Sequence, residues 1–334
     1  SRKKKQRQGP YRVIEKDNGD NFYDFKNKRL YLSDGLQKDV MELLPKVLLS
    51  RNNYSSNLEC LQVDGPQRYD FIVSICQALS SERSNTLKEI YCYGVSFDVL
   101  KAICDMLKRN KSIKRFALNE CHLGNAADSL VANMLEFNNT LSSLHLQGRN
   151  LNDQTTSSLM LSIQNHPSLE HLELIENQIC DRGATSIAND VLRINTRLKT
   201  LELAFNDIGD QGCKALARAL LENPMSCLSG IDLSFNKGIG NIGLKAWAAY
   251  IQTNPQQLRQ LKMNFAGGGL IGARAIFEAF KYNTALGELE LRQDIDRMPS
   301  TKRRLLCHEY RKIVLGNWTA KIPQPDDIHI DEEI

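Results

Sequence analysis

The chain has 334 residues, of which 42% are hydrophobic and 25% are charged, and its formal net charge is +4. This composition excludes a wholly disordered chain, and so small a charge does not mark a dedicated nucleic-acid binder. The apolar stretches are far shorter than the roughly 20 residues that cross a bilayer, so we expect no membrane contact.

The first 26 residues form a basic tail and lead-in, with Arg2, Lys3, Lys4, Lys5 and Arg7 close together. Besides simple solvation, three roles fit this run: a nuclear-import signal, a contact to the phosphates of a nucleic acid, and a contact to an acidic protein surface. Residues 27–57 follow with a short strand pattern and then a helical pattern, which predicts an N-terminal capping repeat.

Residues 58–292 contain nine repeats of the pattern L-x-x-L-x-L, whose starts lie 26 to 30 residues apart. The repeats begin at Leu58, Leu87, Ile113, Leu141, Leu169, Leu198, Leu228, Leu258 and Leu286. A period of this length is typical of a solenoid, because one strand and one helix cannot bury their apolar faces without neighbouring units.

Each repeat opens with a strand pattern whose first, fourth and sixth residues point inward, and continues with a helical pattern. In residues 209–223 the helical face is formed by Leu216, Ala219 and Leu220, and Asp210 is placed to cap its own first turn. The fold class we predict is therefore α/β, a solenoid with parallel strands on the concave face and helices on the convex face.

The ninth repeat position follows each strand and carries Asn177, Asn206 and Asn236, with Cys121 in the same slot. We expect the asparagine amides to satisfy backbone groups of adjacent units, and Cys121 to fill the position as a buried thiol. Phe205, Phe235 and Phe265 precede the ninth position at intervals of 30 residues, so their rings are expected to stack, either as packing or as an exposed apolar stripe.

The pattern L-x-x-L-x-L-x-x-N, with units of this length, resembles the ribonuclease-inhibitor-like class of leucine-rich-repeat proteins. Residues 100–146 most resemble the repeat domain of tropomodulins, which cap actin filaments, and the chain is also similar to regulatory repeat proteins of protein phosphatase 1 and to Ran GTPase-activating proteins. These resemblances imply a non-enzymatic protein-binding scaffold in a cytoskeletal or ciliary assembly, with GTPase activation of the Ran type as the alternative.

Two stretches match the dinucleotide fingerprint GxGxxG: one contains Gly238, Gly240 and Gly243, and the other Gly267, Gly269 and Gly272. The neighbouring repeat keeps the last two glycines as Gly209 and Gly212, which favours a structural turn in which adjacent coils approach closely. We therefore expect no cofactor.

No motif of a nucleophilic, phosphate-binding or zinc-dependent enzyme occurs, so we predict that the chain is not an enzyme. Nine cysteines stand singly, which favours buried thiols in a reducing compartment and a cytoplasmic location over a disulfide framework or a metal site. His145 and His171 lie near Glu170 and Glu173, but without a third ligand in register they are interpreted as contact residues rather than metal ligands.

The residues between the inward leucines form the predicted partner-binding surface on the concave face. It comprises Tyr91, Tyr93, Lys114, Arg115, His145, Glu170, His171, Glu173, Glu202, Asp232, Arg259, Lys262, Glu288 and Glu290. Beyond the repeats, residues 293–322 have helical spacing and are predicted to cap the end of the core, and residues 323–334 form an acidic tail.

Overall fold

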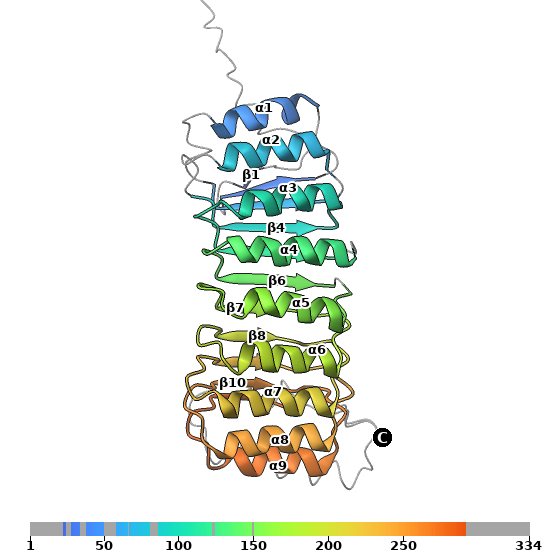
Figure 1. Cartoon of the computed structure of the whole chain (residues 1–334), viewed down its shortest axis with the longest axis vertical. Helices are drawn as coiled ribbons and strands as arrows, with labels where there is room; N and C mark the ends of the chain where they lie inside the picture. Colours follow the sequence, from blue (N-terminus) through green and yellow to red (C-terminus); the bar gives the residue numbers. More distant parts are fainter. Residues whose placement is uncertain are drawn as a thin grey trace, which may run out of the picture.

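The computed structural model describes residues 23–24, 28–33, 38–49, 58–65, 67–80, 86–121, 124–148 and 150–291, in which strands and helices alternate (Figure 1). The basic tail, the C-terminal capping helix and the acidic tail expected from the sequence lie outside these residues. The strands are β1 (Tyr23–Asp24), β2 (Arg29–Leu32), β3 (Cys60–Asp64), β4 (Glu89–Tyr93), β5 (Arg115–Asn119), β6 (Ser143–Gln147), β7 (His171–Glu173), β8 (Thr200–Glu202), β9 (Gly230–Asp232), β10 (Gln260–Lys262) and β11 (Glu288–Glu290). The helices are α1 (Lys38–Leu49), α2 (Tyr69–Ser80), α3 (Phe97–Leu107), α4 (Asn125–Phe137), α5 (Asp153–Ile163), α6 (Asp181–Ser186), the π-helix η2 (Ile187–Leu192), α7 (Asp210–Glu222), α8 (Asn241–Gln252) and α9 (Leu270–Phe280).

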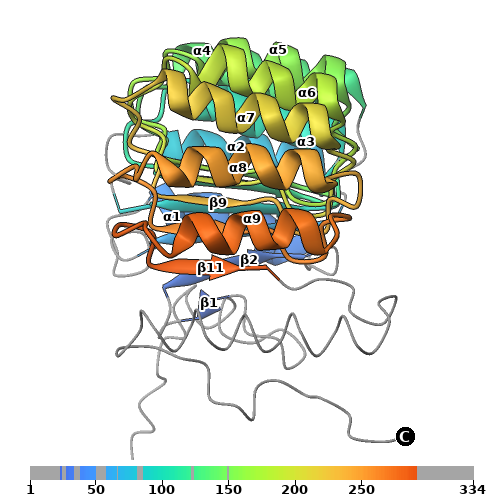
Figure 2. The ribbon, with the colours of Figure 1, turned by 90° about the horizontal axis from the view of Figure 1, so that it is seen from below.

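The strands form one sheet in which each strand pairs with the next along the chain. From β2 to β11 the pairing is parallel, and only β1 runs antiparallel, to β2. The helices cover one side of this sheet and leave the other side without helices among the described residues (Figure 2). The row of helices is arched, with α4 and α5 farthest from the two ends, so the open face of the sheet is concave. The predicted α/β solenoid is therefore confirmed.

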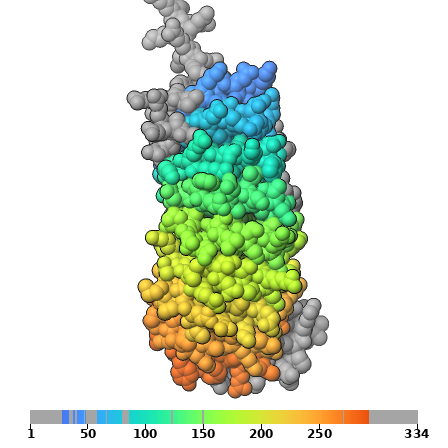
Figure 3. Space-filling model, viewed as in Figure 1, coloured from blue at the N-terminus to red at the C-terminus, as the bar shows by residue number. Residues whose placement is uncertain are grey.

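One hydrophobic core runs through all the units. In the repeat that begins at Leu198, the first, fourth and sixth residues are 3%, 0% and 0% exposed, and the same positions are buried in the repeats on either side. Because the buried leucines of successive units belong to one cluster, the units form one continuous body, as the space-filling view shows (Figure 3).

The asparagines of the ninth position connect each unit to the one before it. Asn206 Nδ2 donates to the carbonyl of Leu174 at 2.9 Å, and its Oδ1 accepts the backbone N–H of Ile179 at 3.1 Å. Asn236 makes the equivalent pair of bonds with Leu203 and Ile208. These bonds satisfy backbone groups that the strand leaves unpaired where the chain turns, so the predicted asparagine ladder is confirmed.

A second ladder of asparagine side chains, which was not predicted from the sequence, joins the C-terminal ends of the helices. Asn138, Asn195, Asn223 and Asn283 each donate a side-chain N–H to a backbone carbonyl 31 or 32 residues earlier in the chain. The acceptors lie at the ends of the preceding helices, whose last carbonyls lack partners within the helix. Both edges of the solenoid are thus held by asparagine side chains.

Candidate functional site: the concave face

One row of side chains runs along the concave face for the whole length of the sheet. The fifth residue of each repeat lies between two buried residues, and the strand register places these fifth residues next to one another. From the N-terminal end, the row is Tyr31, Gln62, Tyr91, Ala117, His145, Glu173, Glu202, Asp232, Lys262 and Glu290. We call this set the central row.

The predicted contact residues fall into three groups in the structure. Tyr91, His145, Glu173, Glu202, Asp232, Lys262 and Glu290 belong to the central row, and Arg115, His171, Glu288 and Tyr93 lie at the ends of the same strands. Lys114, Glu170 and Arg259 each precede a strand by one residue, and of these Glu170 forms an ion pair, with Lys199 Nζ at 2.8 Å from its Oε2. Their contact with a partner stays a prediction.

The N-terminal part of the concave face holds a cluster of guanidinium and tyrosine groups. The Arg29 guanidinium carbon lies 5.4 Å from the ring centre of Tyr91 and 6.0 Å from that of Tyr31, within the range of a cation–π contact. Arg115 Nη1 donates to the Tyr91 hydroxyl at 3.2 Å and lies 3.3 Å from Glu89 Oε1. This hydrogen bond with Tyr91 raises the pKa of Arg115. Arg29 and Tyr31 were not predicted as site residues because they belong to the incomplete first unit, although "RLYL" already alternates.

The buried thiols are chemically inert rather than activated. Burial raises the pKa of Cys60, although the nearby Arg29 and Arg115 act in the opposite direction, and burial raises the pKa of Cys76 to about 12. A nucleophilic cysteine needs a lowered pKa, so these thiols act as small apolar groups of the core.

Hydrogen bonds to neighbouring side chains engage both ring nitrogens of His145. Its Nδ1 lies 2.6 Å from Glu173 Oε2, and its Nε2 lies 2.7 Å from Ser143 Oγ. On the neighbouring strand, His171 Nδ1 lies 2.8 Å from Thr200 Oγ1, and burial lowers the pKa of this histidine. The part of the chain that the structure describes contains no group of three or more histidines, cysteines or acids arranged to hold a metal ion.

Three carboxylates follow His145 in the central row, on β7, β8 and β9. Glu173 lies opposite Glu202, and Glu202 lies opposite Asp232, in the register of the parallel strands. Burial raises the pKa of Glu202, and its two acidic neighbours act in the same direction. The next residue of the central row is Lys262, whose Nζ lies 3.2 Å from Glu290 Oε1. The row is therefore acidic in its centre, with the cation Lys262 on its C-terminal side.

The glycine turns offer no free phosphate-binding site. At a dinucleotide site the backbone N–H groups of the helix start bind the phosphates. Here Asp210 Oδ1 of one unit accepts the N–H groups of Gly240 and Gly243 in the next unit, at 2.7 and 2.6 Å. The expectation that Asp210 caps its own helix is therefore wrong: the cap residue of α7 is Gly209, which has no side chain, and the carboxylate reaches the adjacent coil instead.

The same inter-unit cap recurs in the neighbouring coils. Asp181 Oδ1 accepts the N–H groups of Gly209 and Gly212 at 2.8 and 2.7 Å. A Cβ atom at Gly212 would lie 2.7 Å from the Cβ of Ala184, so the glycine permits the close approach of the coils. The structural interpretation of the glycine motifs is confirmed.

Phe205, Phe235 and Phe265 form a stack at the C-terminal ends of β8, β9 and β10, which we call the phenylalanine column. The ring centres of the first two lie 4.1 Å apart and those of the last two 4.7 Å apart. The predicted stack is therefore confirmed, but the rings are not buried: Phe205 is 50% exposed and Phe265 is 36% exposed.

The backbone of the phenylalanine column is in the left-handed region, with φ between 54° and 59°. The same repeat position holds Gly65, Gly94 and Gly148 in other units, where φ is also positive. A left-handed conformation costs a residue with a Cβ about 1–2 kcal/mol, and an aromatic pair contributes about 0.5–1.5 kcal/mol. Stability alone therefore does not explain why phenylalanine stands where glycine would serve.

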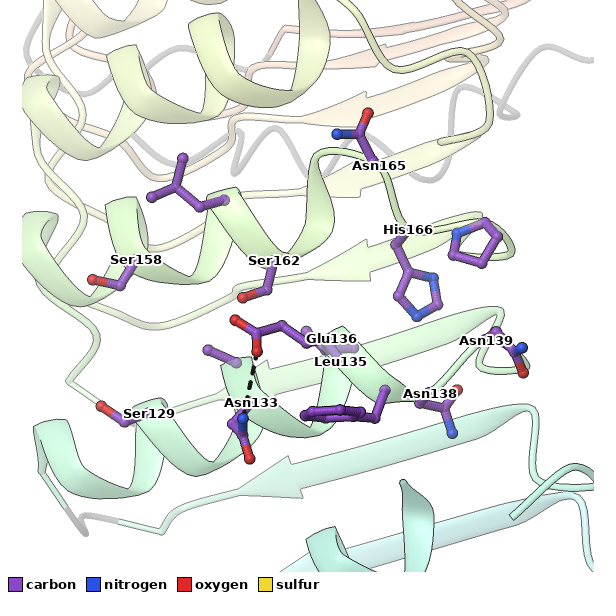
Figure 4. Close-up of a pocket in the computed structure, with 14 residues that line it drawn as sticks. Ser129, Asn133, Leu135, Glu136, Asn138, Asn139, Ser158, Ser162, Asn165 and His166 are labelled. Carbon is purple, nitrogen blue, oxygen red and sulfur yellow. Dashed lines mark hydrogen bonds between the residues drawn. The ribbon is translucent and has the colours of Figure 1, made fainter. Parts of the chain in front are cut away.

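A hollow of about 620 Å³ lies on the helix side, between α4 and α5 (Figure 4). His166 lines it, is 4% exposed, and has an Nε2 atom without a hydrogen bond to any described residue. Burial lowers the pKa of His166, with the Asn138 backbone acting in the opposite direction. His166 stands in the slot that Asn138 and Asn195 fill in the helix-end ladder, so we interpret it as a defect in that ladder.

Comparison with known proteins points to one family. A leucine-rich-repeat family model matches residues 165–188 and 195–217. A NACHT, LRR and PYD domains-containing protein 12 from Mus musculus is 33% identical over 126 residues, which is 36% of this chain and 12% of the relative. The ribonuclease inhibitor of Sus scrofa is 26% identical over 176 residues, which is 52% of this chain and 38% of the inhibitor.

Among solved structures, the tropomodulin C-terminal domain of Caenorhabditis elegans matches 46% of this chain and 90% of its own, at 16% identity and a TM-score of 0.39. The chain thus spans only a minor part of the two curated relatives named above. In the described residues, no helix has the length and apolar character needed to span a membrane. The matched repeats, the similarity to ribonuclease inhibitor and the parallel sheet of strand-and-helix units support a leucine-rich-repeat family of the ribonuclease-inhibitor-like class for this chain.

Proposed function

We propose that the protein is a non-enzymatic interaction scaffold that binds another protein on its concave face. The central row carries this proposal. Ten neighbouring strands present its side chains in one register, and at about 4.8 Å per strand the row extends over about 40 Å. A surface of this length fits a macromolecule better than a small ligand, which is usually enclosed in a cavity.

The charge distribution supports a partner that binds in one orientation. The cations of the guanidinium–tyrosine cluster, Arg29 and Arg115, lie on β2 and β5, whereas Glu173, Glu202 and Asp232 lie on β7, β8 and β9, two to four strands beyond Arg115. Opposite charges separated in this way steer a partner of complementary charge and disfavour the reversed orientation. The name of one relative supports a protein partner, because ribonuclease inhibitor is named for its action on a ribonuclease, which is itself a protein.

The setting that we propose, a cytoskeletal or ciliary assembly in the cytoplasm, rests on the resemblance of residues 100–146 to tropomodulin repeats. The basic residues Arg2–Arg7 would supply a second contact, to an acidic protein or a nucleic acid.

Photo-crosslinking in the native cell tests the proposed face. A photoreactive amino acid would replace Tyr93, Glu202 or Lys262 on the concave face, and Lys101 or Lys214 on the exposed surface of the helices as matched controls. We expect the same protein to be captured from all three concave positions and from neither control. Capture of proteins from the helix side only would contradict the proposal.

A further inference from the structure

The acidic centre of the central row is only partly compensated by neighbouring cations, of which Lys262 acts on Glu202. Glu173 pairs with His145, and Asp232 Oδ1 accepts the N–H of Ser234 at 2.7 Å. Glu202, between them, receives no side-chain hydrogen bond from any residue that the structure describes, and it is only partly exposed. For a partly buried carboxylate without a hydrogen-bond donor, contact with an added cation is more favourable than contact with water alone.

The phenylalanine column runs beside this acidic stretch. Phe205 and Phe235 follow Glu202 and Asp232 by three residues each, so the acid at the end of each of β8 and β9 is followed by an aromatic ring just beyond the strand. The two rows therefore run in parallel over the same coils: carboxylates on β7 to β9, and rings at the ends of β8 to β10.

We propose that these two rows together bind a basic segment of the partner protein, in which lysine or arginine side chains alternate with apolar ones. This inference rests on the proposed function and names the chemistry of the partner at that site. The cations of such a segment would lie over Glu173, Glu202 and Asp232, while its apolar side chains would cover the exposed edges of the stacked rings. Aromatic groups that are partly exposed in the free protein and covered in the complex are typical centres of binding energy.

Other occupants fit the same surface less well. A nucleic acid or an acidic peptide would bring negative charge against three carboxylates, which is unfavourable. A purely apolar segment would cover the rings but would also remove water from the carboxylates without compensation.

Peptide display on the full-length protein tests the inference without knowledge of the partner. The probe is a library of random 12-residue peptides, and selected peptides are measured by fluorescence anisotropy. We expect selected sequences to combine lysine or arginine with leucine or aromatic residues, and their affinity to fall as salt is raised.

Two variants locate the binding. Glu202→Lys and Phe205→Gly should each lower the peptide affinity by about tenfold. Glycine is accepted at this repeat position because Gly65, Gly94 and Gly148 occupy it in other units. The isosteric Glu202→Gln keeps the test valid if the reversed charge disturbs the sheet, and should lower the affinity by about threefold.

Matched controls on the helix side are Glu136→Lys and Leu161→Ala, at exposed positions of α4 and α5, and should leave the affinity unchanged. Selection of acidic peptides that bind at Arg29 and Arg115 would overturn the inference but leave the proposed function standing. Peptide binding confined to the helices would contradict both this inference and the proposed function.

The chain itself contains a basic and apolar segment, residues 301–316, outside the described part of the structure. If Arg303→Glu combined with Arg304→Glu raised the peptide affinity about tenfold, this segment would be the occupant, and the assignment to a partner would be overturned. We expect no change.

Discussion

Replacement of Asp210 by alanine would test how the coils are held together. The Asp210 carboxylate caps the helix of the following unit through the N–H groups of Gly240 and Gly243, at 2.7 and 2.6 Å. In Asp210→Ala both donors, which are part-buried at the start of α8, lose their acceptor.

The expected cost follows from the kind of bond that is lost. A hydrogen bond to a charged group contributes about 1.5–3 kcal/mol, and loss of a helix cap typically costs about 1 kcal/mol. Because the two N–H groups share one oxygen, and water can reach the turn in part, we expect the free energy of unfolding to fall by about 2–3 kcal/mol. Urea titration followed by circular dichroism measures this change as a shift of the midpoint.

The chain supplies its own control for the role of charge. The next unit has Asn241 in the equivalent place, where its Oδ1 accepts the N–H groups of Gly269 and Gly272 at 3.0 and 2.8 Å. Asp210→Asn should therefore retain most of the stability, and Asp207→Ala, at an exposed neighbouring acid, should change it by less than about 0.5 kcal/mol. If Asp210→Ala were as stable as the native chain, or Asp210→Asn as unstable as Asp210→Ala, the inter-unit cap would not have the role given to it.

Three further outcomes follow from the same contacts. Gly212→Ala should destabilise the fold by about 1–3 kcal/mol in urea titrations, since the added Cβ would lie 2.7 Å from that of Ala184; a neutral result would mean that the coils can separate freely. Asn206→Ala should cost about 2–3 kcal/mol by the same measurement, because backbone groups of adjacent units lose their partner; a loss below 0.5 kcal/mol, on the scale of about ±0.5 kcal/mol for neutral surface changes, would contradict the ladder. His166→Asn should raise stability by about 1 kcal/mol by completing the helix-end ladder. It should also flatten the pH dependence: burial lowers the folded-state pKa of His166, so the unfolded chain binds the proton more readily and stability falls as the pH drops below about 6.5. Urea midpoints at neutral and mildly acidic pH, compared between native chain and variant, test both effects, and identical pH curves would refute the second.

The period of the repeats was enough to predict the architecture. Leucines at the first, fourth and sixth positions can be buried only if units stack, and the structure buries Leu198, Leu201 and Leu203 in that way. The asparagine ladder of the ninth position was predictable for the same reason, because the strand ends there and leaves backbone groups that need a side chain.

Contacts between units at the helix ends were not predictable from a single repeat. Asp210 was predicted to cap its own helix because the sequence shows only what is near along the chain, whereas its partners Gly240 and Gly243 lie 30 and 33 residues away. Arg29 and Tyr31 were missed because the first unit lacks the full repeat pattern. A fixed signal for the helix-end ladder was nevertheless present, since Asn138 and Asn195 each stand three residues before a repeat start.

Which residues share the concave face could be predicted from strand alternation, but not which of them interact. Strand alternation placed Glu173, Glu202 and Asp232 on one face, and the register then made them neighbours. The predicted roles of the two tails stay predictions, because the tails lie outside the described residues. The alternative of a GTPase partner also stays a prediction.

Side-chain footprinting of the complex with the crosslinked partner tests the central claim most directly. Hydroxyl radicals label exposed aromatic groups, so the method compares Tyr91 and Phe265 on the strand side with Tyr282, which follows α9 and is 78% exposed. We expect the partner to protect the first two residues and to leave Tyr282 labelled as in the free chain. Protection of Tyr282 with unchanged labelling of Tyr91 and Phe265 would contradict the account, because the partner would then bind the helices and not the sheet.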